Sequence, residues 1–559
     1  MNRIVKKVAT LAIAAATALP LCACGLGRGG GGTVGNGTLL RIYNYNGGYG
    51  TDWLYNAEAA YEAAHPGVDI QIFPEKKDSL NITEIKNSVY SLYFLEGFNY
   101  AELMGEKALD DISAALTTPN PYDNGKKIVD KLTDQQKEYY QIDGKYYALP
   151  HYAGNNGFIY NKKIFDKNNL YFKKDKPDEL TMNYEDFFVS SATEARSEGP
   201  NGKTGVIDGV DYSWDDGLPA TYDEFILLLS YMAAGGLRDA DIKPFTFTGQ
   251  SSEQYVTYLY NALVADYEGP EQMLLNYEFD GEATDLGRIV DGQFEKDATP
   301  TTISEEAMNG YELARQAGKY YALDFLNRIF SNTTFYDAQA AVSTATDTNM
   351  AAQLRFVRGQ AAILTEGVWW EAESEAGYNF STANTTKEAC EFGWMPFPKA
   401  DKTKLGKDTI IDNLYSMCFL KPGLNEQDKA LAIDFIQFFY SDAQLVQYTK
   451  DTGTMRALNY DLSASDLESL TYYGRSLYNY AKTSTTIFPY SKSSIFINHK
   501  SVLEGRFYYT SDYTGANGQP YSTPTKMILN DFLSGGRAAN VAGYFTGMYT
   551  NHQTKWQKW

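Results

Sequence analysis

Cysteine and histidine are scarce in this chain of 559 residues, which has 4 of each. Two cysteines, Cys22 and Cys24, lie near the N-terminus, so only Cys390 and Cys418 remain for the rest of the chain. No histidine stands at metal-ligand spacing from another, so we expect neither a metal ion nor a cofactor. Cys390 and Cys418 either form a disulfide or are two buried free thiols, and the sequence leaves both open.

Positive charge is also in short supply. Lys and Arg number 49 against 70 Asp and Glu, which gives a net charge of −21 and argues against a nucleic-acid partner. After the N-terminal region no apolar run approaches the roughly 20 residues that cross a bilayer. Hydrophobic residues still make up 43% of the chain, enough for a sizeable core and two or more domains.

The N-terminus carries the one apolar run that stands out. Arg3, Lys6 and Lys7 precede the apolar stretch 8–21, which is too short to span a membrane and is typical of a secretory signal. Residues 1–23 are therefore predicted to be a signal peptide. An ordinary secreted protein that is cleaved nearby is the alternative to the anchored form described next.

Leu21-Cys22-Ala23-Cys24 resembles a bacterial lipobox, in which the peptidase cuts just before a cysteine. Cys24 has the small residue directly ahead and leucine three ahead, so Cys24 is the predicted lipid acceptor. Residues 24–37 then form a glycine-rich tether. Several acyl chains on one cysteine would anchor the protein stably. We expect it on the extracellular face of a bacterial cell membrane, touching the membrane only through this anchor.

The remaining chain reads as an α/β protein. Residues 39–45 are predicted to be a buried strand, 51–64 an amphipathic helix and 68–73 a second strand, which together predict a parallel sheet. Residues 409–420 read as a single strand, and the polar stretches near 168–215 and 265–305 as inserted loops or small subdomains. The other elements expected are helices and strands over 91–95, 218–236, 320–330, 350–358, 361–365, 426–440 and 442–451.

Four stretches, in order, resemble the extracellular solute-binding proteins of ATP-binding-cassette (ABC) importers, and among them the sugar binders that include maltose-binding protein. They are Gly144–Pro150 (GKYYALP) with Phe158–Lys162 (FIYNK), Leu218–Phe225 (LPATYDEF, with Tyr222 where tryptophan is usual), Gly359–Trp369 (GQAAILTEGVW), and the helix 426–440 followed by Thr452-Gly453-Thr454. Scattered matches cover most of residues 38–559, although this chain is longer than the usual member.

The resemblance implies a two-lobe periplasmic-binding-protein-like fold, each lobe a mainly parallel sheet flanked by helices. The chain crosses between lobes three times, near 149–152, 413–419 and 453–458. We predict an N-terminal lobe of residues 38–150 plus 414–455 and a C-terminal lobe of residues 151–413 plus 456–559. Ligand would close the hinge between them, and the closed form would dock on the permease subunits of the importer. A monomer is expected.

A sugar site needs flat aromatic faces for C–H groups and fixed polar groups for hydroxyls. Trp369 matches the family's stacking tryptophan, and its neighbours Trp370 and Glu366 are further candidates. Loops at the carboxyl ends of strands supply others. These candidates are Asn46, Tyr49, Trp53, Glu96, Asn155, Asn156 and Asp412, with Trp214, Trp394 and Tyr415 in second rank. The tyrosine content, 45 residues, also suits aromatic surfaces with polar rims.

The expected function is capture of a carbohydrate, more readily an oligosaccharide than a monosaccharide, and its delivery to an ABC permease. A binder for a non-sugar solute such as a peptide or a polyamine is the main alternative. A surface glycosidase is a further one, since it would need only two carboxylates about 5 to 9.5 Å apart. The chain carries no Ser/His/Asp order, P-loop or H-E-x-x-H motif, so we expect no enzymatic activity.

Overall fold

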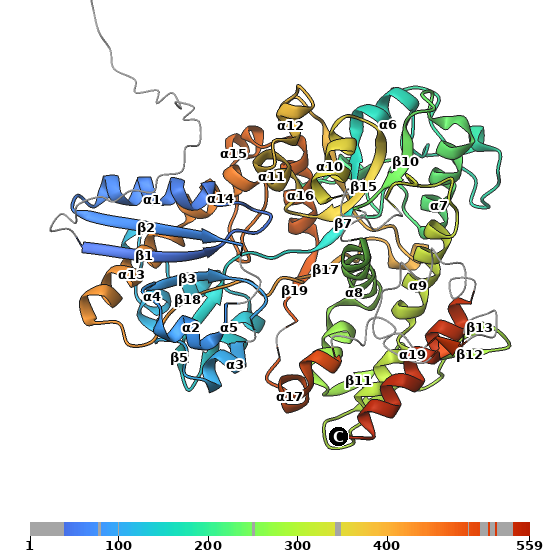
Figure 1. The fold of residues 1–559 in the computed structure, drawn as a ribbon. Helices are drawn as coiled ribbons and strands as arrows, with labels where there is room; N and C mark the ends of the chain where they lie inside the picture. Colours follow the sequence, from blue (N-terminus) through green and yellow to red (C-terminus); the bar gives the residue numbers. More distant parts are fainter. Residues whose placement is uncertain are drawn as a thin grey trace, which may run out of the picture. The chain divides into compact units, whose positions relative to one another are not determined.

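The computed structural model describes residues 38–559, leaving out 77–79, 99, 209, 249–251, 341–347, 490, 504–512, 515–519 and 522–539. The described part forms one compact unit (Figure 1). The predicted signal peptide, Cys24 and the tether lie outside the described residues. Within the described part, no helix has the length and apolar character needed to cross a membrane.

The first sheet has five strands in the order β2-β1-β3-β18-β6. β1 pairs in parallel with β2 and β3, while β18 runs antiparallel to both β3 and β6. The predicted β-α-β unit is therefore present. The five strands of the sheet are β1 (Thr38–Tyr45), β2 (Val68–Glu75), β3 (Leu92–Leu95), β6 (Ala148–Pro150) and β18 (Met417–Leu420).

The second sheet has four strands in the order β10-β15-β7-β16. β10 and β15 are parallel, and β7 runs antiparallel to β15 and β16. Its central strands are buried along their whole length, as expected for a sheet covered on both faces. The strands are β7 (Asn156–Asn161), β10 (Lys243–Thr246), β15 (Ala361–Gly367) and β16 (Phe392–Met395).

In each sheet a single strand opposes the others. In the second sheet it is β7, which follows β6 of the first sheet across the segment 151–155. In the first sheet it is β18, which follows β17 (Thr409–Ile411), a strand paired with β19 outside both sheets, across the segment 412–416. The loops that end β1 and β15 meet at this boundary, as the site geometry shows. β7 and β18 start at the boundary between the sheets and therefore run away from it. They are antiparallel to strands such as β1 and β15, which end at that boundary.

Helices cover both sheets. α1 and α13 pack on the first sheet, while α8 packs on the second together with α10 and α16. The helices are α1 (Asp52–Ala64), α2 (Ile82–Asn87), α3 (Tyr100–Gly105), α4 (Ser113–Thr117), α5 (Asp134–Tyr140), α6 (Lys162–Asn168), α7 (Tyr222–Tyr231), α8 (Ser252–Glu278), α9 (Ala317–Phe330), α10 (Asn349–Val357), α11 (Trp370–Ala376), α12 (Asn379–Thr382), α13 (Glu426–Phe439), α14 (Asp442–Thr452), α15 (Ala464–Ser469), α16 (Tyr472–Thr483), α17 (Ser494–Leu503) and α19 (Val541–Trp556).

Short strand pairs complete the described part. They are β4 (Gln141–Ile142) with β5 (Lys145–Tyr146), β8 (Val206–Ile207) with β9 (Val210–Asp211), β11 (Gly281–Ala283) with β14 (Thr301–Ile303), β12 (Gly287–Val290) with β13 (Gln293–Lys296), β17 with β19 (Thr485–Ile487), and β20 (Tyr513–Thr514) with β21 (Pro520–Tyr521).

The two faces of the second sheet have different cores. Phe158 stacks on Phe225 of α7, with ring centroids 4.8 Å apart. Trp394 is paired in register with Ile159, the next residue of β7, so its side chain lies on the opposite face. There it packs against Tyr473 of α16. The second sheet is thus enclosed by α7 and α9 on one side and by α10 and α16 on the other.

One sequence expectation differs from the structure. The single strand predicted over 409–420 is two strands, β17 and β18, separated by 412–416. The stretch 265–305, expected to be inserted loops or a small subdomain, begins in α8, where two helical segments meet at Gly269, and continues into four short strands. Cys390 and Cys418 are both free thiols, which decides the alternative left open by the sequence.

Candidate functional site

Three aromatic side chains from different segments meet where the loops of the two sheets converge. Tyr49 follows β1, Tyr152 lies in the segment 151–155, and Trp369 follows β15. The ring of Tyr49 lies 4.5 Å from that of Tyr152 and 6.5 Å from that of Trp369. Tyr255 of α8 packs edge-on against Trp369, with ring centroids 6.2 Å apart. We call Tyr49, Tyr152, Trp369 and Tyr255 the aromatic cluster.

Trp369 lies directly against the backbone of the loop that follows β1. A Cβ atom on Gly48 would come within 2.2 Å of Trp369 Cδ1, so only glycine allows this approach. Gly154 is similarly close, since a Cβ there would lie 3.2 Å from Trp369 Cζ3. The indole is consequently only 7% exposed. In this conformation the protein's own backbone covers it.

A carboxylate borders the aromatic cluster on the side of the first sheet. Glu96, just after β3, accepts a hydrogen bond from the Tyr152 hydroxyl at 2.6 Å. Burial raises the pKa of Glu96 to about 7, although the Tyr152 hydrogen bond favours the charged form. The charge of Lys76 acts on both Glu96 and Glu373. Glu96 can thus offer either an acceptor or a protonated donor near neutral pH.

Glu366 is fully buried in β15 and belongs to a hydrogen-bonded network. Its oxygens accept from the Gln353 amide at 3.1 Å and from the Gly367 N–H at 2.9 Å. The same Gln353 amide nitrogen donates to Glu373 at 2.8 Å. Burial, and then the charge of Glu373, raise the pKa of Glu366. Glu366 therefore lies behind Trp369 as a support, with both of its oxygens already engaged.

Asp412 joins two of the segments that connect the sheets. It is fully buried, and one of its oxygens accepts from Gly154 N–H at 2.9 Å and Leu414 N–H at 3.0 Å, while the other accepts from Tyr415 N–H at 3.1 Å. Burial raises the pKa of Asp412 to about 6, against the effect of these three N–H groups. The structure thus uses this predicted ligand residue to fix the backbone between the sheets.

The chain crosses a third time after α14, which packs on α1, on its way to α16, which packs on β16. This third connecting segment, residues 453–458, is held by a buried guanidinium. Arg456 donates to the His151 carbonyl at 3.2 Å and lies 2.8 Å from His151 Nδ1. Its charge rests over the rings of Tyr440 at 3.9 Å and Phe439 at 4.2 Å. Burial, and then Arg456, lower the pKa of His151 well below its usual range, so this histidine stays neutral.

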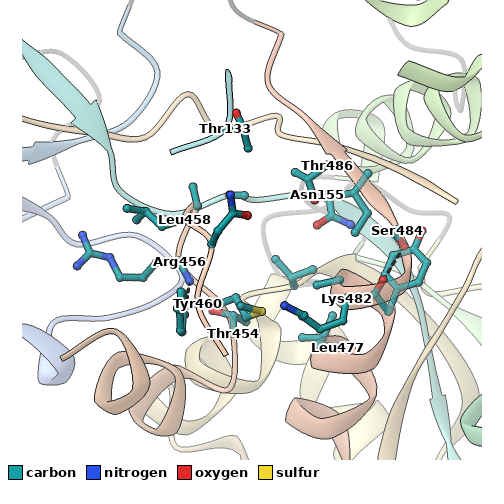
Figure 2. Close-up of a pocket in the computed structure, with 18 of the residues that line it drawn as sticks. Thr133, Asn155, Thr454, Arg456, Leu458, Tyr460, Leu477, Lys482, Ser484 and Thr486 are labelled. Carbon is teal, nitrogen blue, oxygen red and sulfur yellow. Dashed lines mark hydrogen bonds between the residues drawn. The ribbon is translucent and has the colours of Figure 1, made fainter. Parts of the chain in front are cut away.

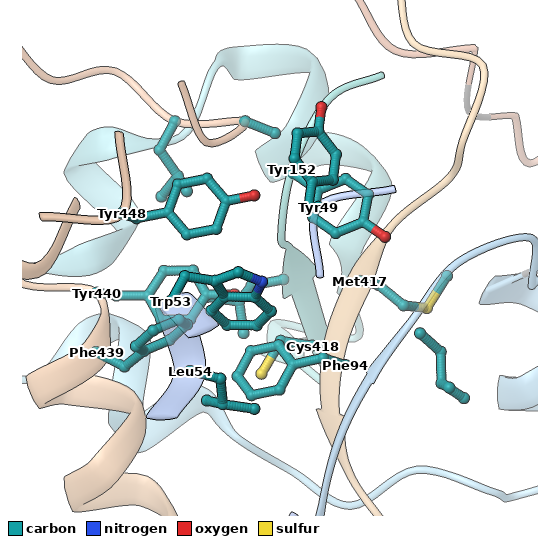
Figure 3. Packing of buried hydrophobic residues seen from close by; sticks show 14 of the residues in the cluster. Tyr49, Trp53, Leu54, Phe94, Tyr152, Met417, Cys418, Phe439, Tyr440 and Tyr448 are labelled. Atoms are coloured by element: carbon teal, nitrogen blue, oxygen red, sulfur yellow. The ribbon is translucent and has the colours of Figure 1, made fainter. Parts of the chain in front are cut away.

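Trp53 and Trp370 pack in the hydrophobic core and do not belong to the aromatic cluster. Trp53 donates to the Gly50 carbonyl at 3.0 Å and lies among Phe94, Phe439 and Tyr448, as Figure 3 shows. Trp370 has no exposed surface. Its neighbours are Phe356, Phe380, Phe392 and Tyr473. Their burial is explained by packing alone.

The segment 151–155 has two faces. Tyr152 and Gly154 face the aromatic cluster, whereas Ala153 and Asn155 line a cavity of about 290 Å³ on the other side (Figure 2). This is the alternation expected of an extended backbone. Asn155, predicted to contact the same ligand as Trp369, is therefore directed into a separate space.

The remaining candidates are dispersed. Asn46 lies half-buried in the loop after β1, where its N–H donates to the Glu75 carbonyl at 3.0 Å. Asn156 is fully buried in β7, opposite Gly367. Trp394 covers Gly157 in the core, Trp214 packs 6.5 Å from the ring of Tyr480, and Tyr415 adjoins Asp412.

Sequence reasoning missed Gly48, Tyr152, Tyr255 and Leu414 as parts of this region. Leu414 lies where a Cβ on Gly154 would come within 2.2 Å of it, and its carbonyl accepts from Gly97 N–H. Gly48 lies between the predicted site residues Asn46 and Tyr49, and Tyr152 lies in the predicted crossing 149–152. Their positions in the sequence were therefore a signal that could have found them. Tyr255 gave none, because α8 had not been predicted. No cluster of metal-ligating side chains occurs in the described ranges.

Comparison with known proteins identifies the fold. No protein-family profile and no curated protein sequence matches the chain. Solved structures do. A chitin oligosaccharide binding protein aligns with TM-score 0.52 and 15% identity, covering 94% of this chain and 100% of that one. An ABC substrate-binding protein from Listeria monocytogenes, in complex with cycloalternan, aligns with TM-score 0.51 and 12% identity, covering 93% and 99%.

The GacH receptor of Streptomyces glaucescens, solved unliganded and with acarbose, aligns with TM-score 0.50 and 12% identity, covering 94% of this chain and 99% of that one. At these identities the likeness concerns the fold. The chain has the two-lobe α/β fold of sugar-binding solute-binding proteins, which confirms the predicted fold class.

Proposed function

We propose that the protein is an extracellular solute-binding protein that captures a carbohydrate between its two lobes and delivers it to an ABC importer. The observation that carries this proposal is the position of Trp369. Its indole comes from the second sheet and lies against Gly48 and Tyr49, which follow a strand of the first sheet. The fold shared with oligosaccharide binders supports the same function.

A pyranose ring would take the place of the contact between Trp369 and Gly48. The indole offers a flat face for sugar C–H groups, and Tyr49 and Tyr152 combine apolar faces with hydroxyls. Glu96 stands at hydrogen-bonding distance from Tyr152 and supplies an acceptor at the same edge. Opening of the lobes would separate Gly48 from Trp369, and a bound sugar would bridge the surfaces again.

A non-sugar solute is the second candidate, since the carboxyl groups of Glu96, Glu366 and Glu373 lie around Trp369 and would attract a polyamine. All three carboxyl groups are already hydrogen-bonded within the protein, Glu96 to Tyr152 and the other two in the Gln353 network. The similar proteins are binding proteins, and we propose no catalytic residue.

Calorimetric titration separates these possibilities. The titrants are chitooligosaccharides, maltodextrins, cycloalternan and acarbose, with spermidine and a tripeptide as the non-sugar arm. We expect one oligosaccharide to bind at one site per chain. A ligand held at 100 times its Kd should stabilise the fold by about 2.7 kcal/mol, which a thermal shift would detect. Binding of spermidine or peptide alone would overturn the sugar proposal, and sugar hydrolysis by the wild type would show an enzyme.

The location is part of the proposal. Cys24 would carry the lipid and residues 24–37 would tether the two lobes outside the cell. Cys24→Ala should release the protein into the medium or leave it unprocessed, because the acyl acceptor is gone. Cys22→Ala is the matched control and should leave anchoring unchanged. Metabolic labelling with a fatty acid checks both variants. Loss of the label in Cys22→Ala alone would show that Cys22, and not Cys24, is the lipid acceptor.

A further inference from the structure

We infer that the cavity on the far side of the segment 151–155 is a second binding site, for a neutral polyhydroxylated molecule about the size of one sugar ring. Its volume of about 290 Å³ is close to the lower end of pockets that hold small ligands. The cavity lies between the first and third connecting segments, with α16 and β19 as further walls (Figure 2). This inference goes beyond the proposed function and does not depend on it.

The cavity is separate from the aromatic cluster. Val368 N–H donates to the Asn155 carbonyl at 3.0 Å, which closes the backbone between the two spaces. Val368 lines the cavity, whereas its neighbour Trp369 packs on Gly48 and Tyr49. A sugar stacked on Trp369 would therefore not reach Asn155, and a molecule in the cavity would not reach the indole.

The lining combines aliphatic and polar neutral groups. Val368, Leu458 and Leu477 form an apolar part, and Asn155, Thr454 and Thr486 supply an amide and two hydroxyls. Asn155 as a residue is 6% exposed and lines the cavity. Its side-chain amide is not among the fully buried polar atoms that lack a partner in the described residues, so it borders the cavity space, where it can bond to the hydroxyl groups of an occupant.

Charge around the cavity favours a neutral occupant. None of its lining residues carries a carboxylate. Lys482 is paired with Asp461 at 2.6 Å, and the guanidinium of Arg456 lies 2.8 Å from His151 Nδ1. Figure 2 shows this guanidinium directed away from the other labelled residues of the cavity. A charged molecule would lose its hydration without gaining an unpaired partner, whereas hydroxyl groups match the amide and hydroxyls that are available.

Occupation of the cavity should affect the relation between the lobes. Thr133 precedes α5, which packs on β6 of the first sheet, while Thr486 belongs to β19 beside the second. The side-chain amide of Gln135 bonds Phe488 twice, donating to its carbonyl at 2.6 Å and accepting from its N–H at 3.1 Å. Since the walls come from both sides, hinge motion would change the cavity, and its occupant would be linked to closure.

The test uses the variant Trp369→Ala, in which stacking at the first site is removed. The probes are methyl α-D-glucopyranoside and myo-inositol, with D-glucuronate as the charged comparison. Ligand-detected NMR should show both neutral rings binding with a Kd of about 1 mM, the order expected for so small a ligand. D-glucuronate should bind at least about tenfold more weakly.

Three substitutions in the cavity and one control, each made in the Trp369→Ala background, locate the probe. Ala481→Phe should abolish binding by filling the cavity, and Ala59→Phe, on the exposed face of α1, is the matched control that should change nothing. Asn155→Leu and Thr486→Val remove polar groups at similar volume and should each weaken binding severalfold; melting temperatures show that each variant folds. The inference is overturned if neither ring binds at concentrations about 20-fold above that Kd, or if Ala481→Phe and Ala59→Phe bind equally well.

Discussion

At the residue scale, Trp369 and Trp370 are adjacent indoles with different surroundings. Trp369 contacts loops that end strands of both sheets, whereas Trp370 is enclosed by aromatic side chains of its own lobe. Trp369→Ala should weaken sugar binding by about 2 kcal/mol, or roughly 30-fold, as expected for a central aromatic contact. Calorimetry with the oligosaccharide found for the wild type measures the change.

Trp370→Ala provides the matched control for that prediction. Removing a fully buried indole should lower the free energy of unfolding by about 3 to 5 kcal/mol, while the folded fraction keeps its affinity. Melting temperature without ligand, read beside Kd, distinguishes the two effects. An early-melting Trp369→Ala with unchanged affinity would assign Trp369 to the core and remove the central residue of the proposed site.

Glu96 makes the stability depend on pH. Its pKa is raised from 4.5 to about 7 by burial, so the folded state holds the proton more tightly than the unfolded chain. Its contribution to stability is present below about pH 4.5 and is lost as the pH rises through about 7. Glu96→Gln should raise the melting temperature at pH 8 more than at pH 5, while Glu106→Gln, an exposed control, should not. Equal shifts at both pH values would contradict this.

The sequence predicted well where local pattern decides. The family motif placed Trp369 at the end of β15, and that loop does meet the loops of the first sheet. The role of Asp412 was not predictable, because its three N–H partners include Gly154, which is 258 positions away in the sequence. Trp370 and Trp53 show the same limit of inference from sequence. The sequence alone does not distinguish a tryptophan at a binding site from one in a core, because the difference lies in tertiary packing.

At the element scale, the loop between β1 and α1 determines how closely the two sheets approach. Gly48→Ala would place a Cβ within 2.2 Å of Trp369 Cδ1, so the indole or the loop must move. Overpacking of this kind typically costs 1 to 3 kcal/mol, so we expect weaker closure and about tenfold or greater loss of sugar affinity.

Gly105→Ala, where no atom lies within 4 Å of the new Cβ, is the matched control and should bind like the wild type. The double variant Gly48→Ala, Trp369→Ala gives a second check. Since the clash disappears with the indole, the two changes should be strongly non-additive. Additive losses of affinity would mean that Gly48 and Trp369 act independently.

Element boundaries show where tertiary contacts override local pattern. Residues 409–420 are apolar enough to predict one strand, yet Asp412 turns the backbone by accepting N–H groups that a continuous ladder would use. α8 shows the reverse. Gly269 and Pro270 signal a break, and the backbone is indeed non-helical at Gly269, where two helical segments meet. Local pattern does not show that α8 packs against β7 and β15.

Across the whole molecule, the three connecting segments are hydrogen-bonded to one another through Asp412 and Arg456. They should therefore act as one hinge, and rotation about it should open the contact between Trp369 and Gly48. Small-angle scattering should show a smaller radius of gyration when the oligosaccharide is added, since ligand favours the closed form. Tight binding with an unchanged radius would contradict hinge closure.

The placement of Trp369 also gives the protein an optical reporter of its own. The chain has 7 tryptophans, and Trp53, Trp370 and Trp394 lie in cores that hinge motion leaves intact. Trp369 is different, because backbone from the other lobe shields it from water. Its emission should move to longer wavelengths whenever the lobes part, so stopped-flow fluorescence of the unlabelled protein would time the opening that precedes each capture.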